Sequence, residues 1–245
     1  MSSATDIFDV DGRATVRSDD GVFFRVPGEP SSTLAAGMMD RVLAELAERR
    51  NAGLTPLRGR EHVSIAADGP VAGELLDTLT SAGVQAQRVD PASSADCGGL
   101  LLHVPTSPAE RSRFDNLPTV GTAVLRCYQE GEVVFVDPLA AGPLDPSGAQ
   151  VLRRRLAASP AATELRTWLD TPAAHGFELS GASRDLLTAR LLVMVKAWQT
   201  GAATLPPLSR TLWRLDTRTL TVTEHPVLPF PEPALLAGGR SAAGA

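Results

Sequence analysis

The clearest pattern of apolar and polar positions lies between residues 62 and 90, where it predicts a strand, a helix and a second strand. The run HVSIAA has the length and the apolar content of a buried strand. Pro70 is favourable in the first turn of a helix, and the apolar residues after it recur at helical spacing up to Gly83. Residues 84–89 then alternate as a strand. Two strands joined by one helix are expected to be parallel, with a right-handed connection.

A smaller set of elements is expected before this unit. Residues 14–17 and 22–26 alternate as two short strands around the turn Asp20–Gly21, which is a hairpin signal. Apolar residues at a spacing of four predict a helix from Ser31 to about Arg50. Residues 1–56 are therefore interpreted as an N-terminal hairpin-plus-helix element.

The remainder of the chain alternates between strands and helices. Strands are predicted at residues 99–104, 122–128, 132–137, 211–216 and 219–223. Helices are predicted at residues 149–158, 160–169 and 185–200, with Ser147 and Ser183 as the N-caps of the first and the last. This order predicts an α/β fold, with a doubly wound, mainly parallel sheet and antiparallel strands at one edge. Residues 57–235 are interpreted as this domain, and residues 236–245 as a disordered tail.

Composition narrows the classes of partner. Of the 245 residues, 43% are hydrophobic and 21% are charged, as is ordinary for a soluble globular protein. The formal net charge of −5 gives no reason to expect nucleic acid or an anionic membrane as a partner. The chain starts with polar residues rather than a signal peptide, and no apolar stretch is long enough to span a bilayer. We therefore expect a cytoplasmic protein.

No metal site and no catalytic constellation are expected from the sequence. The two cysteines, Cys97 and Cys127, lack C-x-x-C spacing, and the four histidines lack the spacing of metal ligands. No G-x-S-x-G nucleophile motif occurs. Both cysteines are interpreted as buried or incidental residues.

The turn after the first predicted parallel strand carries a degraded phosphate-binding motif. Where a dinucleotide-binding unit has the glycines of G-x-G-x-x-G, this chain has Ala67, Gly69 and Ala72. Pro70 removes one backbone N–H donor. Asp90 follows about 20 residues later, at the position of a ribose-binding acid. The scaffold is thus predicted without a bound cofactor. The alternative is a nucleotide-dependent enzyme, adenylating or oxidoreductase, that uses Gly69 and Asp90 with an atypical loop.

Two segments are candidates for binding a partner. Arg153, Arg154 and Arg155 fan around a predicted helix and can pair with the carboxylates of an acidic peptide. A solvated helix with ion pairs is the other interpretation of this arginine run. The edge of the predicted N-terminal hairpin, with Val22 and Phe24, can accept a peptide strand.

Three segments resemble one family, in the order in which that family has them. They are VSIAADGPVAGELLDTLTSAGVQAQRV, LLTARLLVMVKAWQTG and WRLDTRTLTVTEHPVLPFPEP. They resemble the first strand–helix–strand unit, the helix after the adenylation core, and the closing strands of ThiF-like proteins. These proteins share the Rossmann-like fold of ubiquitin-activating-type adenylating enzymes. The likeness covers residues 60–233, and its last segment resembles members from clusters that make thiazole/oxazole-modified peptides such as thiopeptides.

The resemblance implies a function in the biosynthesis of ribosomally made, post-translationally modified peptides (RiPPs). In those clusters, the family member usually binds the leader of the precursor peptide and delivers it to a YcaO-type cyclodehydratase. Many members also hold zinc with two C-x-x-C pairs, but Glu232, Pro233 and Ala234 stand here where cysteines would be. The resemblance therefore implies a non-catalytic accessory or scaffold protein whose partner is the precursor peptide, the cyclodehydratase or both. Proteins of this fold are often homodimers, so a homodimer is a further expectation.

Overall fold

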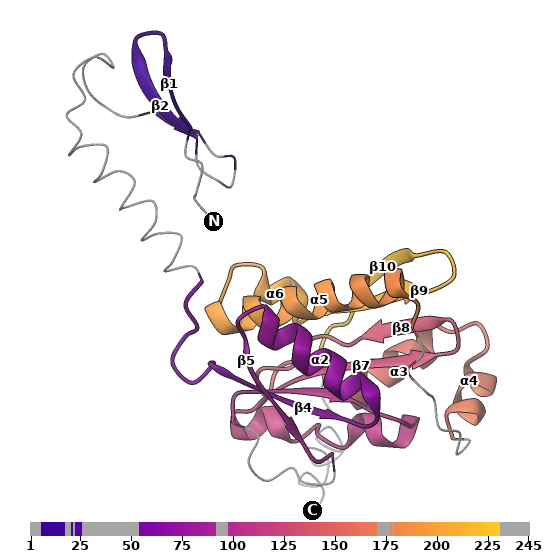
Figure 1. Ribbon diagram of the computed structural model, residues 1–245. Coiled ribbons are helices and arrows are strands. Elements are labelled where there is room, and N and C mark those ends of the chain that lie inside the picture. Colours follow the sequence, from indigo (N-terminus) through magenta and orange to yellow (C-terminus); the bar gives the residue numbers. More distant parts are fainter. Residues whose placement is uncertain are drawn as a thin grey trace, which may run out of the picture. The chain divides into compact units, whose positions relative to one another are not determined.

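The chain divides into two compact units, Met1–Leu54 and Thr55–Ala245, each taken here by itself. The computed structural model (Figure 1) describes residues 6–17, 21, 23–25, 54–91, 98–170, 177 and 179–230. The predicted helix from Ser31 to about Arg50 and the candidate Val22 lie outside the described residues.

The first unit contains a three-stranded antiparallel sheet. Its strands are β1 (Asp6–Val10), β2 (Arg13–Arg17) and β3 (Phe23–Arg25), in the order β1-β2-β3. The predicted hairpin is confirmed, since β2 and β3 pair antiparallel. Strand β1 was not predicted, because the apolar residues of its sequence, DIFDV, do not alternate strictly with polar ones. As the outer strand of this sheet, β3 has a second edge that β2 does not cover.

The second unit is built on a seven-stranded sheet in the order β10-β9-β8-β7-β6-β4-β5. Its strands are β4 (His62–Ala67), β5 (Gln85–Val89), β6 (Leu100–Val104), β7 (Ala123–Glu130), β8 (Val133–Val136), β9 (Thr211–Asp216) and β10 (Thr221–Pro226). The strands from β5 to β7 are parallel, and β8, β9 and β10 add antiparallel to one side. The α/β class and the antiparallel strands at one edge are therefore confirmed.

Helices cover both faces of this sheet. They are α2 (Pro70–Ser81), α3 (Gly148–Ala158), α4 (Ala162–Leu169), α5 (Gly181–Thr200) and α6 (Leu205–Leu208), with the 3₁₀ helices η2 (Pro108–Ser112) and η3 (Leu117–Val120). The largest apolar core lies between the sheet and the pair α2 and α5 (Figure 1). Along β6, Leu100 and Leu102 face this core, whereas Leu101 faces a second cluster with Phe114 and Leu117. Alternate side chains of a strand point to opposite faces, so β6 is apolar on both.

Helix boundaries agree with the sequence at α3 and differ at α5. Ser147 caps α3, because its side chain accepts a hydrogen bond from the backbone N–H of Gln150 at 3.2 Å. The expectation that Ser183 caps α5 is wrong, since the helix begins at Gly181 with Ser180 at the N-cap position. Ser183 is instead buried in the first turn, where its hydroxyl donates to the carbonyl oxygen of Thr217 at 3.3 Å. A contact with a distant turn has overridden the local capping signal.

Gly99 lets the chain enter β6 close to β4. Its φ is +86°, and a Cβ atom at this position would overlap the carbonyl oxygen of His62. The neighbouring Gly98 has no atom within 4 Å of the position of a Cβ atom. A side chain is therefore excluded by packing at Gly99 but has space at the adjacent Gly98.

We predict that Gly99→Ala lowers the free energy of unfolding of the second unit by about 2–4 kcal/mol, because a left-handed backbone is strained for alanine and the new methyl group overpacks β4. Gly98→Ala is the matched control and changes it by less than about 0.5 kcal/mol. Urea denaturation followed by tryptophan fluorescence measures both, since all three tryptophans lie in the second unit. Equal effects of the two substitutions would contradict this account of Gly99.

Candidate functional site

A small cavity lies at the carboxyl ends of β4 and β6. From β4 the chain passes to β5 on one side, and the next strand, β6, lies on the other side of β4. Ligands of open α/β sheets bind where strand order reverses in this way. The cavity has a volume of about 220 Å³ and is lined by residues 68–71, 104–106 and Phe177.

The degraded phosphate motif borders this cavity and serves the fold. Gly69 is the N-cap residue of α2, with a φ of +66° that favours glycine. Ala67 and Ala72, at the first and third glycine positions, are fully buried in the main core. Pro70 occupies the first helical position and offers no N–H group. These four residues are thus explained by a tight turn and close helix–strand packing.

The cavity has little with which to hold a nucleotide. Asp68 is the only ionisable residue among the described residues that line it. The backbone N–H and the hydroxyl of Thr106 donate to Glu110, at 2.8 and 3.0 Å. Asp90 follows β5 and does not line the cavity, so the structure does not bring the two cofactor candidates, Gly69 and Asp90, together there. Ligand pockets are typically about 300–1,000 Å³, which is larger than this one.

Burial shifts the pKa values of two titratable side chains of the sheet, Cys127 and His103. Burial, together with Asp137, raises the pKa of the Cys127 thiol to about 12. Burial, together with Arg126 and Arg113, lowers the pKa of His103 to about 3. At neutral pH, Cys127 is therefore a thiol rather than a nucleophilic thiolate, and His103 is uncharged. In the described part of the chain, no three His, Cys, Asp or Glu residues are grouped so that they could hold a metal ion.

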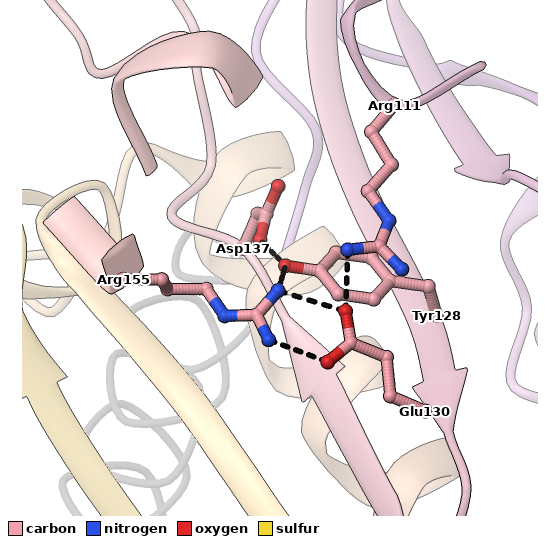
Figure 2. A network of polar contacts seen from close by, with 5 residues as sticks. All are labelled: Arg111, Tyr128, Glu130, Asp137 and Arg155. Atoms are coloured by element: carbon pink, nitrogen blue, oxygen red, sulfur yellow. Dashed lines mark hydrogen bonds and ion pairs between the residues drawn. The ribbon is translucent and has the colours of Figure 1, made fainter. Parts of the chain in front are cut away.

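The arginine run of α3 divides between the inside and the outside of the fold. Arg155 points inward, and its two terminal nitrogens donate to the carboxylate of Glu130 at 2.9 and 2.5 Å (Figure 2). Arg153 lies over the ring of Phe230, 5.7 Å from its centroid, and Arg154 is exposed. Partner binding by this helix would therefore fall to Arg153 and Arg154, because Arg155 is engaged by its own chain.

Glu130 is the centre of a buried polar network (Figure 2). It also pairs with Arg111 of η2, whose guanidinium carbon lies 3.9 Å from the centroid of the Tyr128 ring. The Tyr128 hydroxyl donates to Asp137 at 3.0 Å. Burial raises the pKa of Glu130, but the guanidinium groups of Arg155 and Arg111 outweigh it, so its pKa lies below the usual value. The network ties η2 and α3 to the same strand, β7.

The sequence did not reveal this network. Its pattern places Glu130 in a hairpin turn, whereas β7 extends through Glu130 and its side chain is only 9% exposed. A charged residue at the end of an apolar run was the one available signal, and it is equally typical of a turn. The partners Arg111 and Arg155 are 19 and 25 residues away, and only the fold brings them to it.

The small N-terminal sheet presents an aromatic pair. Phe8 of β1 is 39% exposed and Phe23 of β3 is 61% exposed, with their ring centroids 6.0 Å apart and the rings nearly perpendicular. The candidate Phe24 lies in β3, where it pairs with Val16 of β2. Exposed aromatic side chains beside an open strand edge are typical of surfaces that bind peptides.

Comparison with solved structures identifies proteins that share the fold of this chain. No protein-family model matches the sequence, and no curated protein matches it. A heterocyclase in complex with substrate and cofactor is 11% identical, with a TM-score of 0.63 over 92% of this chain and 38% of that one. The heterocyclase TruD is 13% identical, with a TM-score of 0.61 over 93% and 41%. This chain thus spans about two fifths of the heterocyclase chains.

A shorter neighbour matches from end to end. A chain of the E. coli microcin synthetase McbBCD complex is 11% identical, with a TM-score of 0.55 over 93% of this chain and 97% of that one. At such low identities the likeness establishes a shared fold. Within the described residues, no helix combines the length and the apolar character needed to cross a membrane.

We predict that Glu130→Gln destabilises the second unit by about 3–5 kcal/mol at pH 7, because it removes the charged partner of two buried guanidinium groups. Since the pKa of Glu130 is lowered by folding, its stabilisation is complete above the ordinary value of 4.5 and is lost as the pH falls through the folded value. The gap between wild type and variant should therefore shrink below about pH 4.5, as urea denaturation at a series of pH values can measure.

Glu132→Gln is the control for this experiment. Glu132 also pairs with an arginine, Arg218, but both side chains are about 70% exposed. An exposed pair of this kind contributes at most about 1 kcal/mol. If Glu130→Gln were as mild as Glu132→Gln, the network would not hold the unit together.

Proposed function

We propose that this chain is a non-catalytic, ThiF-like accessory or scaffold protein in RiPP biosynthesis. It acts in the cytoplasm and holds a precursor peptide, a YcaO-type cyclodehydratase or both. Its scaffold corresponds to a degenerate, doubly wound ThiF/Rossmann-like domain, and it performs no bond chemistry itself.

One observation carries the proposal: among the described residues, the lining of the crevice where open α/β sheets bind ligands has no basic side chain for a phosphate. The lining offers one carboxylate, and no basic residue among those described, to a triphosphate. Phosphates are usually held by backbone N–H groups, arginines, lysines and metal ions. The chain nevertheless keeps the fold seen in a heterocyclase with its substrate and in the microcin synthetase complex with pro-MccB17 bound. A retained fold without a nucleotide crevice favours a binding role.

The edge of β3 that β2 does not cover is the first surface proposed for the leader peptide. A peptide that adds as a strand gains main-chain hydrogen bonds from the edge and side-chain contacts from the faces. Phe24 belongs to β3, and Phe23 of the same strand is 61% exposed. Val22 immediately precedes this strand in the sequence. Arg153 and Arg154 on α3 form the second proposed surface, which suits an acidic peptide.

The second candidate function is a nucleotide-dependent enzyme with an atypical loop. It is favoured by the place of Gly69, which stands at the N-terminus of α2 and at the point where strand order reverses. Asp90 at the end of β5 would serve as the ribose contact. In this alternative, a nucleotide would have to enlarge the small cavity on binding.

For the scaffold, we expect a fluorescent leader peptide from a thiazole/oxazole-modified precursor to bind saturably in an anisotropy titration. Phe23→Ser should weaken binding about 5–20-fold, because an exposed aromatic residue at a peptide surface is a typical hot spot. Val120→Ser removes a 72% exposed side chain from the second unit and should leave affinity unchanged. Equal losses in the two variants would argue against the β3 edge.

For the nucleotide, we expect calorimetric titration with Mg–ATP and with NADPH to show no saturable heat up to about 1 mM ligand, a concentration that detects even weak sites. The physical reason is that the described lining of the cavity carries a carboxylate and no basic residue, and that Pro70 has no N–H to donate. Micromolar binding that disappears in Asp90→Ala would establish the enzyme in place of the scaffold.

A further inference from the structure

Strand β10 closes one side of the seven-stranded sheet (Figure 1). Its residues Thr221–Pro226 pair antiparallel with β9 on the inner side, and within the described residues no strand pairs with the outer side. Proteins normally shorten, bulge or charge an open edge, because it can add to any strand that it meets. β10 is six residues long and carries a single acidic side chain, Glu224. This edge is therefore open to a further strand.

The backbone groups of Val222 and Glu224 point to the open edge. The N–H of Val227 donates to the carbonyl oxygen of Arg210 at 2.8 Å, so these two opposite residues form a hydrogen-bonded pair. Hydrogen-bonded and non-hydrogen-bonded pairs alternate along an antiparallel ladder. The register therefore directs the N–H and C=O groups of residues 225, 223 and 221 to β9, and those of residues 226, 224 and 222 outward. Pro226, which has no N–H, stands at one of the outward positions, where β9 needs no donor.

The side chains at the outward positions lie on the face of the sheet that α5 covers. Val222 pairs with Leu215, which is buried in the core beneath α5, and paired residues of neighbouring strands point to the same face. Glu224 is on this face too, since Arg190 of α5 pairs with its Oε1 atom at 2.9 Å. Val222 is 41% exposed and the Glu224 side chain is 52% exposed. The edge thus presents one apolar and one acidic side chain, two residues apart.

The flank of α5 beside this edge is apolar. Leu186 and Val193 are 38% and 54% exposed, and Ala182 and Ala189 lie on the same line along the helix. Arg190 reaches β10 from a position between Leu186 and Val193 in the sequence, so this flank lies on the β10 side of the helix. Strand addition combines main-chain hydrogen bonds along an edge with contacts for alternate side chains. Both are available here.

A second copy of β10 fits this edge poorly. Two copies can pair antiparallel only through their outward residues, and two registers have the greatest overlap. One sets Glu224 opposite Glu224, and the other sets Glu224 opposite Val222. Like charges directly opposite each other destabilise a sheet, and a carboxylate gives an apolar residue no favourable partner. The edge is therefore matched by a strand of different sequence.

We propose that the β10 edge binds an extended peptide segment of another protein, in which a lysine or arginine and an apolar β-branched residue stand two positions apart. In the antiparallel arrangement the basic residue lies opposite Glu224, where the carboxylate has a second oxygen, Oε2, with which it can pair. The apolar residue lies opposite Val222, beside the flank of α5. Such a segment is the reverse in charge of the acidic peptide suited to Arg153 and Arg154, so the proposal is independent of the function proposed above.

The first test is an anisotropy titration of the full chain with the fluorescein-labelled peptide Gly-Ser-Val-Thr-Lys-Thr-Val-Thr. We expect saturable binding with a dissociation constant below about 300 μM. Val222→Pro removes an outward N–H and should weaken binding at least about tenfold. Pro226→Val supplies an N–H at an outward position and should tighten binding about threefold, the effect of one added hydrogen bond.

The gain in Pro226→Val keeps this test decisive, because a misfolded variant does not bind more tightly. The proposal would be overturned if the peptide failed to saturate the chain up to about 1 mM, or if Pro226→Val bound no better than wild type.

The second test concerns the charge of the peptide. Replacing its lysine with glutamate should weaken binding to the wild-type chain about fivefold, because like charges then stand opposite each other. Glu224→Gln should bind the two peptides equally, since glutamine keeps the shape without the charge. Asp77→Asn, at an exposed position of α2, should keep the preference of the wild type. A wild-type chain without preference would contradict the assigned place of the basic residue.

The third test distinguishes the peptide from a second copy of this chain. Light scattering after gel filtration should give the same mass for the wild type and for Val222→Pro, because β10 does not pair with itself. A wild-type dimer that Val222→Pro converts to a monomer would show that a second copy occupies the edge, and would overturn the proposal.

Discussion

The architecture of the second unit depends on one buried carboxylate. Glu130 ends β7 and accepts hydrogen bonds from Arg111 of η2 and Arg155 of α3. Because these charges are largely removed from water, each is stable only while its partner is in place. The position of α3 on the sheet is therefore fixed by electrostatics as much as by apolar contact. Arg153 and Arg154 are exposed on α3, and the pairing of Arg155 with Glu130 holds this helix on the sheet.

The same distribution of charge bears on whether an anionic ligand can bind at the sheet. The buried Arg111 and Arg155 both bind the chain's own carboxylate, Glu130 of β7. At the carboxyl ends of β4 and β6, the lining residues present Asp68 and backbone turns that serve packing. An anionic cofactor would meet a carboxylate and no described cation there. The surfaces proposed for partner binding are instead the edge of β3 and the exposed arginines of α3.

Local sequence patterns predicted most of the helices and strands. Features that depend on contacts between residues far apart in the sequence were not predicted. The unit from residue 62 to 90 was predictable because apolar spacing, Pro70 and Gly83 all agree over a short stretch. Ser183 was wrongly predicted as the N-cap of α5, because Ser180 is equally suited to that position. The hydrogen bond from Ser183 to the carbonyl oxygen of Thr217, which the sequence does not reveal, decides between the two serines. The arginine run was found as a run, but its division into inward and outward residues depends on Glu130. No periodicity in the sequence encodes such a pairing.

The central claim is that this chain presents a peptide and leaves bond formation to another protein. Its most direct test is the rate of heterocycle formation by a YcaO-type cyclodehydratase, measured by mass spectrometry against precursor concentration, with and without this chain. The account predicts that the chain lowers KM for the precursor at unchanged kcat, and that the chain alone with ATP leaves the precursor unmodified. Modification by the chain alone, or an unchanged KM in its presence, would contradict it.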